Sequence, residues 1–119
     1  MADPERLSDG ALVVRCGQPP FGRPTTLSER CDIHEGVFGF SAQSADGVPL
    51  DRLAAWCPNR KVGVLTVGEI RALGYDVVIT SGQGYHASVV VPRAWDPAAA
   101  EGLAHAFREA TNPSPRKSR

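Results

Sequence analysis

The sequence has few cysteines, no excess of one charge and no long apolar runs. Together these absences limit the compartment and the kinds of partner that we expect for the protein. Its three cysteines, Cys16, Cys31 and Cys57, are too few and odd in number for a disulfide framework, so we expect free thiols in a reducing compartment. Thirteen basic residues balance thirteen acidic ones, which removes the broad positive field of a nucleic-acid binder and argues against a nucleic-acid partner. The polar N-terminus lacks the apolar stretch of a secretory signal, and no run could cross a bilayer. The sequence therefore predicts a cytoplasmic protein without a membrane anchor.

The size and composition predict one small globular domain. The chain has 119 residues, of which 42% are apolar and 22% charged, enough apolar side chain to build one core. We expect a single domain over residues 11–111, between a disordered N-terminus at 1–10 and a disordered basic tail at 112–119. Ten prolines and twelve glycines, with many alanines and arginines, suggest a high-GC bacterial source.

Five segments have the pattern of β-strands. They are rich in β-branched or aromatic residues and bounded by turn residues, at 11–16, 37–43, 61–65, 75–80 and 86–91. The last two are separated by the five-residue, glycine-containing segment 81–85, which is typical of a hairpin.

Three segments carry helix signals. Pro49 and Pro58 bracket a short helix at 49–57. Thr66 and Glu69 form a capping-box pattern for a helix that Gly74 ends. Asp96 and Pro97 begin a last helix that the apolar spacing extends to about Ala110. The mixture of hairpin and helices predicts an α+β fold with a largely antiparallel sheet of about five strands and three helices.

The connection over residues 17–36 has no sustained period and several breakers. A loop of this length in a compact domain is usually either functional or disordered, so the sequence leaves open whether it acts as a lid.

His86 and Ser88 are the first candidate site residues. They alternate with Ala87, so on a strand they project from one face, opposite the apolar face of Ala87, Val89 and Val91. A His-x-Ser pair can bind and protonate a phosphodiester oxygen, as in two-histidine phosphoesterases. That family needs a second such strand, and His34 has no Ser or Thr two positions later. A His86 that bonds backbone beside the hairpin turn is the favoured interpretation.

Arg15 is the second candidate. On the first strand, ahead of a loop with Thr25, Thr26 and Ser28, it is similar to the Arg that ADP-ribosyltransferase-like folds use to hold a dinucleotide, and a guanidinium fork suits a pyrophosphate. The late carboxylate or glutamine that such an enzyme needs is missing from the right strand. A solvated or salt-bridged Arg15 is therefore favoured.

The three cysteines and His34 are the candidate ligands for a zinc site. Thiolate and imidazole are suitable ligands, but structural zinc sites usually have two tight ligand pairs, and only Cys31 and His34 are close in sequence. We therefore expect no metal and no cofactor.

A family resemblance rests on two segments, VGVLTVGEIRALG at 62–74 and HASV at 86–89. Together they resemble a set of small actinobacterial proteins that share a VGVxTVGEIRAxG…HAxV signature and have no established activity. The resemblance implies a recurrent fold and carries no catalytic residue to this chain.

Two functions follow as hypotheses. The leading one is a small cytoplasmic interaction module, a monomer or weak dimer with a protein partner, such as one component of a bacterial toxin–antitoxin or defence gene pair. The alternative is a small ADP-ribosyltransferase-like or phosphoesterase-like enzyme, with Arg15, His34 and His86 lining one pocket and Ser88 beside them.

Overall fold

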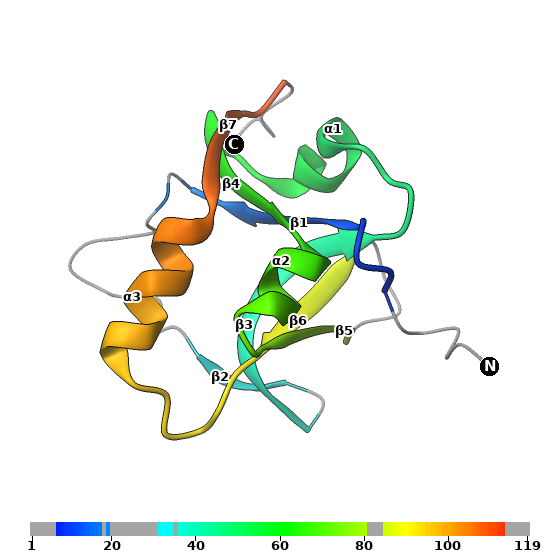
Figure 1. Ribbon diagram of the computed structural model, residues 1–119. Helices are drawn as coiled ribbons and strands as arrows, with labels where there is room; N and C mark the ends of the chain where they lie inside the picture. Colours follow the sequence, from blue (N-terminus) through cyan, green and yellow to red (C-terminus); the bar gives the residue numbers. More distant parts are fainter. Residues whose placement is uncertain (1–6, 18, 20–30, 35, 81–84, 114–119) are drawn as a thin grey trace.

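The computed structural model describes residues 7–17, 19, 31–34, 36–80 and 85–113. Its elements follow the order β1 (Leu12–Cys16), β2 (Asp32–His34), β3 (Val37–Ala45), α1 (Leu50–Leu53), the 3₁₀ turn η2 (Ala54–Trp56), β4 (Lys61–Thr66), α2 (Val67–Ala72), β5 (Asp76–Ile79), β6 (His86–Val90), α3 (Pro97–Ala106) and β7 (Arg108–Thr111) (Figure 1). This is the predicted α+β class.

The strands form one antiparallel sheet in the order β5-β6-β3-β1-β4-β7. The long strand β3 is its centre. β6 runs along one side of β3, while β1 and β2 share the other side, β1 beside residues 43–45 and β2 beside residues 37–39. The predicted hairpin of β5 and β6 is confirmed, with Val78 opposite Ser88.

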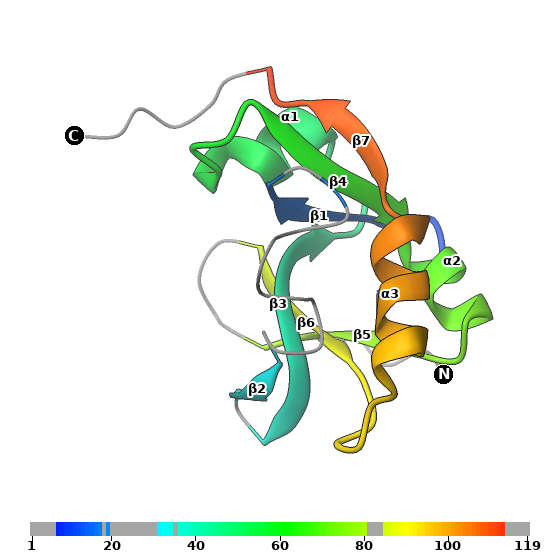
Figure 2. The ribbon, with the colours of Figure 1, turned by 90° about the vertical axis from the view of Figure 1, so that its left-hand side faces the viewer.

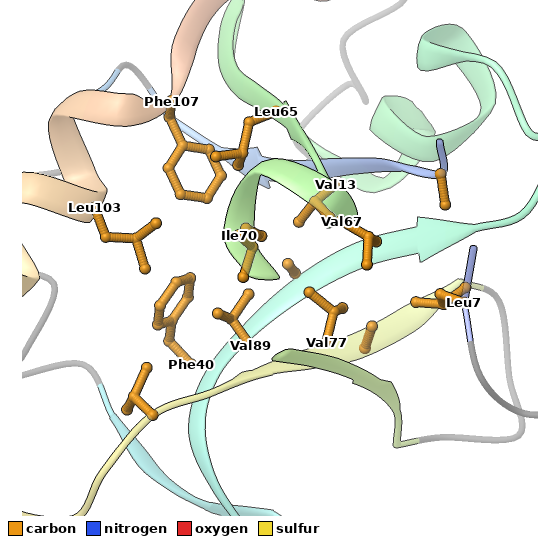
Figure 3. Packing of buried hydrophobic residues seen from close by; sticks show 14 of the residues in the cluster. Leu7, Val13, Phe40, Leu65, Val67, Ile70, Val77, Val89, Leu103 and Phe107 are labelled. Carbon is orange, nitrogen blue, oxygen red and sulfur yellow. The ribbon is translucent and has the colours of Figure 1, made fainter. Parts of the chain in front are cut away.

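The two faces of the sheet carry two separate apolar clusters. The main core is covered by α2 and α3 and is built around large side chains (Figure 3), among them Val13, Phe40, Leu65, Ile70, Val89, Leu103 and Phe107. The second core lies on the other face, under α1 and η2 (Figure 2), and consists of Val14, Leu53, Ala54, Cys57 and Val62. Neighbouring residues of β1 thus serve opposite cores, as strand alternation requires.

The local helix signals of the sequence are confirmed. Thr66 and Glu69 make both hydrogen bonds of the capping box at the start of α2. Gly74 follows α2 with a positive φ of 95°, a conformation that glycine adopts without steric cost. The Asp96 carboxylate accepts from the Ala98 amide at 3.1 Å, and Pro97 is the first residue of α3.

The prediction that the last helix runs to about Ala110 is wrong. α3 ends at Ala106, and residues 108–111 form β7, which pairs with β4 in the register Lys61 with Thr111. Phe107 takes an extended conformation between the two elements and is buried. The edge of β4 offers backbone groups that need partners, a requirement that the helical spacing of the segment does not reveal. β2, with only three residues, was also not predicted.

The packed unit includes residues outside the predicted limits of 11–111. Leu7 is 2% exposed and belongs to the main core. Asn112 is 3% exposed and donates to the carbonyls of Ala54, Cys57 and Asn59 at 3.3, 3.1 and 3.1 Å. Residues 1–6 and 114–119 lie outside the described residues. None of the helices in the described ranges is long and apolar enough to span a membrane.

The expectation of three free thiols is wrong for two of them. Cys16 and Cys57 form a disulfide, with their Cα atoms 5.3 Å apart, while Cys31 is free. The 41-residue sequence separation gave no sign of this pairing. The sheet brings the end of β1 beside the residue that follows η2, and only this arrangement places the two sulfur atoms in reach.

Candidate functional site

The candidate site is a chain of three polar side chains at the turn end of the β5–β6 hairpin. Thr80 Oγ1 lies 2.9 Å from His86 Nδ1, and Ser88 Oγ donates to Thr80 Oγ1 at 3.2 Å. The Thr80 amide also bonds to the His86 carbonyl, at 3.4 Å. His86 and Ser88 were predicted to share one face of the strand, and the structure brings them together through Thr80.

Two hydrogen bonds connect these three side chains in a row, with Thr80 in the middle. Thr80 Oγ1 accepts from Ser88, and in its hydrogen bond with His86 Nδ1 either atom can donate, according to the imidazole tautomer. A hydroxyl at this distance from an imidazole is the geometry of a nucleophile with its base.

Burial limits the access of a substrate to the Thr80 hydroxyl beside His86. Thr80 is 4% and Ser88 is 2% exposed, whereas His86 is partly exposed. Buried hydroxyl groups need hydrogen-bond partners, and here each supplies one for the other. The favoured sequence interpretation has His86 bonded to backbone, which stays a prediction; the structure shows the Thr80 hydroxyl as a side-chain partner of His86.

Thr80 is the site residue that sequence reasoning missed. A signal for it was present, because a five-residue connection at 81–85 leaves Thr80 and His86 as the pair that closes the hairpin. The predicted apolar face of the strand is confirmed, since Ala87, Val89 and Val91 are all buried.

Arg15 lies on the opposite face of the sheet from His86. It follows Val13 by two residues and points, like Val13, to the main-core side. There its guanidinium lies 5.1 Å from the centroid of the Phe40 ring and donates to the Ser41 carbonyl at 2.6 Å. His86, by contrast, is in register with Gln43, and Gln43 with Val14 of the second core.

This separation bears directly on the enzyme hypothesis, which needs Arg15, His34 and His86 in one pocket. Two of the three side chains are divided by the sheet itself. His34 ends β2, in register with Val37, and its side chain lies outside what the structure describes. Thr25, Thr26 and Ser28 of the hypothetical dinucleotide site also lie outside the described residues.

The cysteines do not assemble a metal site in the described part of the chain. Cys16 and Cys57 are bonded to each other, and no group of three potential ligands is found among the described residues. Cys31 packs against the main core. Burial raises the pKa of its thiol, and the positive charge of Arg15 offsets part of that rise, so the uncharged thiol is favoured at neutral pH.

One cluster of charged side chains lies at the start of α2 and on β7. Arg108 of β7 forms two hydrogen bonds with the Glu69 carboxylate, at 2.8 and 2.9 Å. These bonds, together with the Thr66 amide, lower the pKa of Glu69 from 4.5 to about 2. The cluster joins the start of α2 to β7. Its charges therefore have a structural role, because they pair with each other.

Comparisons add no functional assignment to this geometry. No family model, curated protein or solved structure matches the chain, so the resemblance to small actinobacterial proteins stays a prediction.

Proposed function

We propose that the protein is a small interaction module whose partner is another protein, which adds a strand to the β5 edge of the sheet. The polar side chains that an enzyme would need together are divided between two faces, whereas this edge presents an accessible apolar side chain. Ile79 on β5 is 44% exposed and is the observation that carries the proposal. The balanced charge of the chain also favours a protein over a nucleic acid.

The hydrogen-bond pattern of the hairpin shows which backbone groups β5 offers. The Thr80 amide bonds to His86, so by antiparallel alternation Val78 also bonds inward, while Val77 and Ile79 point outward. The Val77 amide is already taken by the Asp76 carboxylate, at 2.8 Å. The backbone of Ile79 is thus the part of the outer edge that this aspartate does not cover.

The other edge strands differ from β5 in charge or in length. β7 carries Arg108 and Glu109, and charged side chains on an edge strand discourage pairing with another chain. β2 is three residues long, and Asp32 covers the Ile33 amide at 2.8 Å, as Asp76 covers that of Val77. An incoming strand could pair with Ile79 and pack against its side chain, the mode known as β-augmentation.

The biological setting is part of the proposal. We place the module in the cytoplasm, as one component of a bacterial gene pair of the toxin–antitoxin or defence type. It would act there by binding a protein partner. The free protein would then be a monomer or a weak dimer.

Co-expression with each neighbouring gene product tests the proposal. We expect one product to co-elute with the full chain in size-exclusion chromatography. Ile79→Lys should weaken that complex at least tenfold, because a charge on the edge opposes strand addition. Ile79→Pro should do the same by removing the outward amide, which an edge strand tolerates.

Leu73→Lys is the matched control. Leu73 is 51% exposed but lies just after α2, off the edge, so this variant should keep full affinity. Equal binding by the Ile79 and Leu73 variants, or the lack of any co-eluting product, would contradict the proposal.

A further inference from the structure

The disulfide between Cys16 and Cys57 joins the end of β1 to the residue that follows η2, beside the second core to which Val14, Leu53 and Ala54 also belong. Cys16 is the last residue of β1 and is exposed, whereas Cys57 follows η2 and is fully buried. A thiol from solution therefore reaches the sulfur of Cys16 and not that of Cys57.

The bond fastens the cover of the second core. α1 has four residues and η2 three, too few to be stable helices without tertiary support. Their own buried side chains are Leu53 and Ala54. Leu50 also packs against the second core, and the Arg52 guanidinium lies 5.9 Å from the centroid of the Tyr85 ring. The Asn112 amide contacts the carbonyls of Ala54, Cys57 and Asn59.

The main core is independent of this bond. Neither Cys16 nor Cys57 belongs to the cluster beneath α2 and α3, which lies on the opposite face of the sheet (Figures 1 and 2). Loss of the disulfide therefore removes a constraint from one face of the sheet and leaves the packing of the other face in place.

We propose that the Cys16–Cys57 disulfide is a redox latch that opens the segment 50–57 over the second core while the rest of the fold stays intact. A small dithiol is the reductant. One of its thiolates attacks Cys16 Sγ, the sulfur–sulfur bond breaks, and Cys57 leaves as a thiolate that takes a proton from solvent. The second thiolate of the reductant then attacks the mixed disulfide, releases Cys16 as a thiolate and forms a disulfide within the reductant.

Opening of the latch changes what the protein presents to its surroundings. With the bond reduced, α1 and η2 are held by non-covalent contacts alone, and transient opening uncovers Val14 and Val62, both fully buried in the closed form. Local opening of this kind is a normal property of weakly packed segments. The redox state would thus control access to an apolar surface on the second-core face.

Amide hydrogen exchange on the full chain, with and without dithiothreitol, tests the latch. The amides of Leu53 and Cys57 bond to the carbonyls of Pro49 and Ala54 and report on the segment. We expect their exchange to accelerate by about tenfold or more on reduction, while amides of β3 and β6 keep their protection. Thiol titration under denaturing, non-reducing conditions should find one free thiol per chain before reduction and three after it.

Two variants complete the design. Cys16→Ser should exchange fast at Leu53 and Cys57 with or without reductant. Cys31→Ser, which removes the free thiol, should keep the full response to reductant. Three free thiols before reduction, unchanged exchange at Leu53 and Cys57, or equal acceleration in β3 and β6 would each overturn the proposal. The wild-type measurement decides by itself if Cys16→Ser does not fold.

Discussion

Replacement of Asn112 by alanine should destabilise the protein far more than its place near the C-terminus suggests. The Asn112 amide has two N–H groups and meets three carbonyls, those of Ala54, Cys57 and Asn59, at 3.1–3.3 Å. Two lost hydrogen bonds cost about 1 kcal/mol each, and the carbonyls of Cys57 and Asn59, left without this donor, add about 1–3 kcal/mol. The Ala54 carbonyl keeps the Cys57 amide as a donor at 2.9 Å. We therefore expect Asn112→Ala to lower the free energy of unfolding by about 3–5 kcal/mol.

Asn112→Asp separates the hydrogen-bonding effect from the loss of packing. Aspartate has nearly the shape of asparagine, but its carboxylate only accepts, so it would set negative oxygen atoms against the same carbonyls. At neutral pH this variant should be less stable than Asn112→Ala, because it also buries an unpaired charge. Thr111→Ala, at the exposed neighbouring position, should stay within about 0.5 kcal/mol of wild type.

Urea denaturation under non-reducing conditions measures these differences with the disulfide intact. If Asn112→Ala changed the free energy of unfolding by less than about 0.5 kcal/mol, the Asn112 side chain would contribute little to stability. An Asn112→Asp variant as stable as Asn112→Ala would refute the role of the amide as donor.

Three further perturbations have defined outcomes. Gly39→Ala should lower the free energy of unfolding, measured by thermal melting, by about 3 kcal/mol or more, because its Cβ would lie 1.8 Å from a carbonyl oxygen of β6. Gly102→Ala, with open space around it, should instead stabilise α3 slightly when measured in the same way. The lowered pKa of Glu69, about 2, means that its bond to Arg108 stabilises the fold above pH ~4.5. That contribution should vanish as the pH falls towards 2, and urea midpoints of Glu69→Gln and wild type should converge over that range; a constant difference would contradict it. His86→Ala should cost about 1–2 kcal/mol by calorimetry, since it removes the imidazole that bonds to the buried Thr80 hydroxyl, and a change within about 0.5 kcal/mol would show that this bond contributes little.

Local signals were sufficient wherever a few neighbouring residues decide the conformation. The capping box at Thr66, the proline start of α3 and the glycine at position 74 each act through bonds within one turn. The alternation along β6 likewise identified Ala87, Val89 and Val91 as the residues that face the main core, because a strand with one apolar face must turn that face to a core.

The sites were less predictable, since they depend on which segments meet. Spacing showed that His86 and Ser88 share a face, but it could not show that Thr80 links them. It also could not show which face of the sheet Arg15 would occupy, because the neighbouring residues Val13 and Val14 are both buried, in opposite cores.

By itself, the sequence determined the fold class, most of the elements and their caps, because these follow from short-range periodicity and turn chemistry. Only the tertiary structure decided that residues 108–111 become a strand, that Asn112 is a buried donor and that Cys16 meets Cys57. In each case the deciding partner lies about forty residues or more away along the chain. Such contacts are set by the packing of the whole sheet, and no local pattern encodes them.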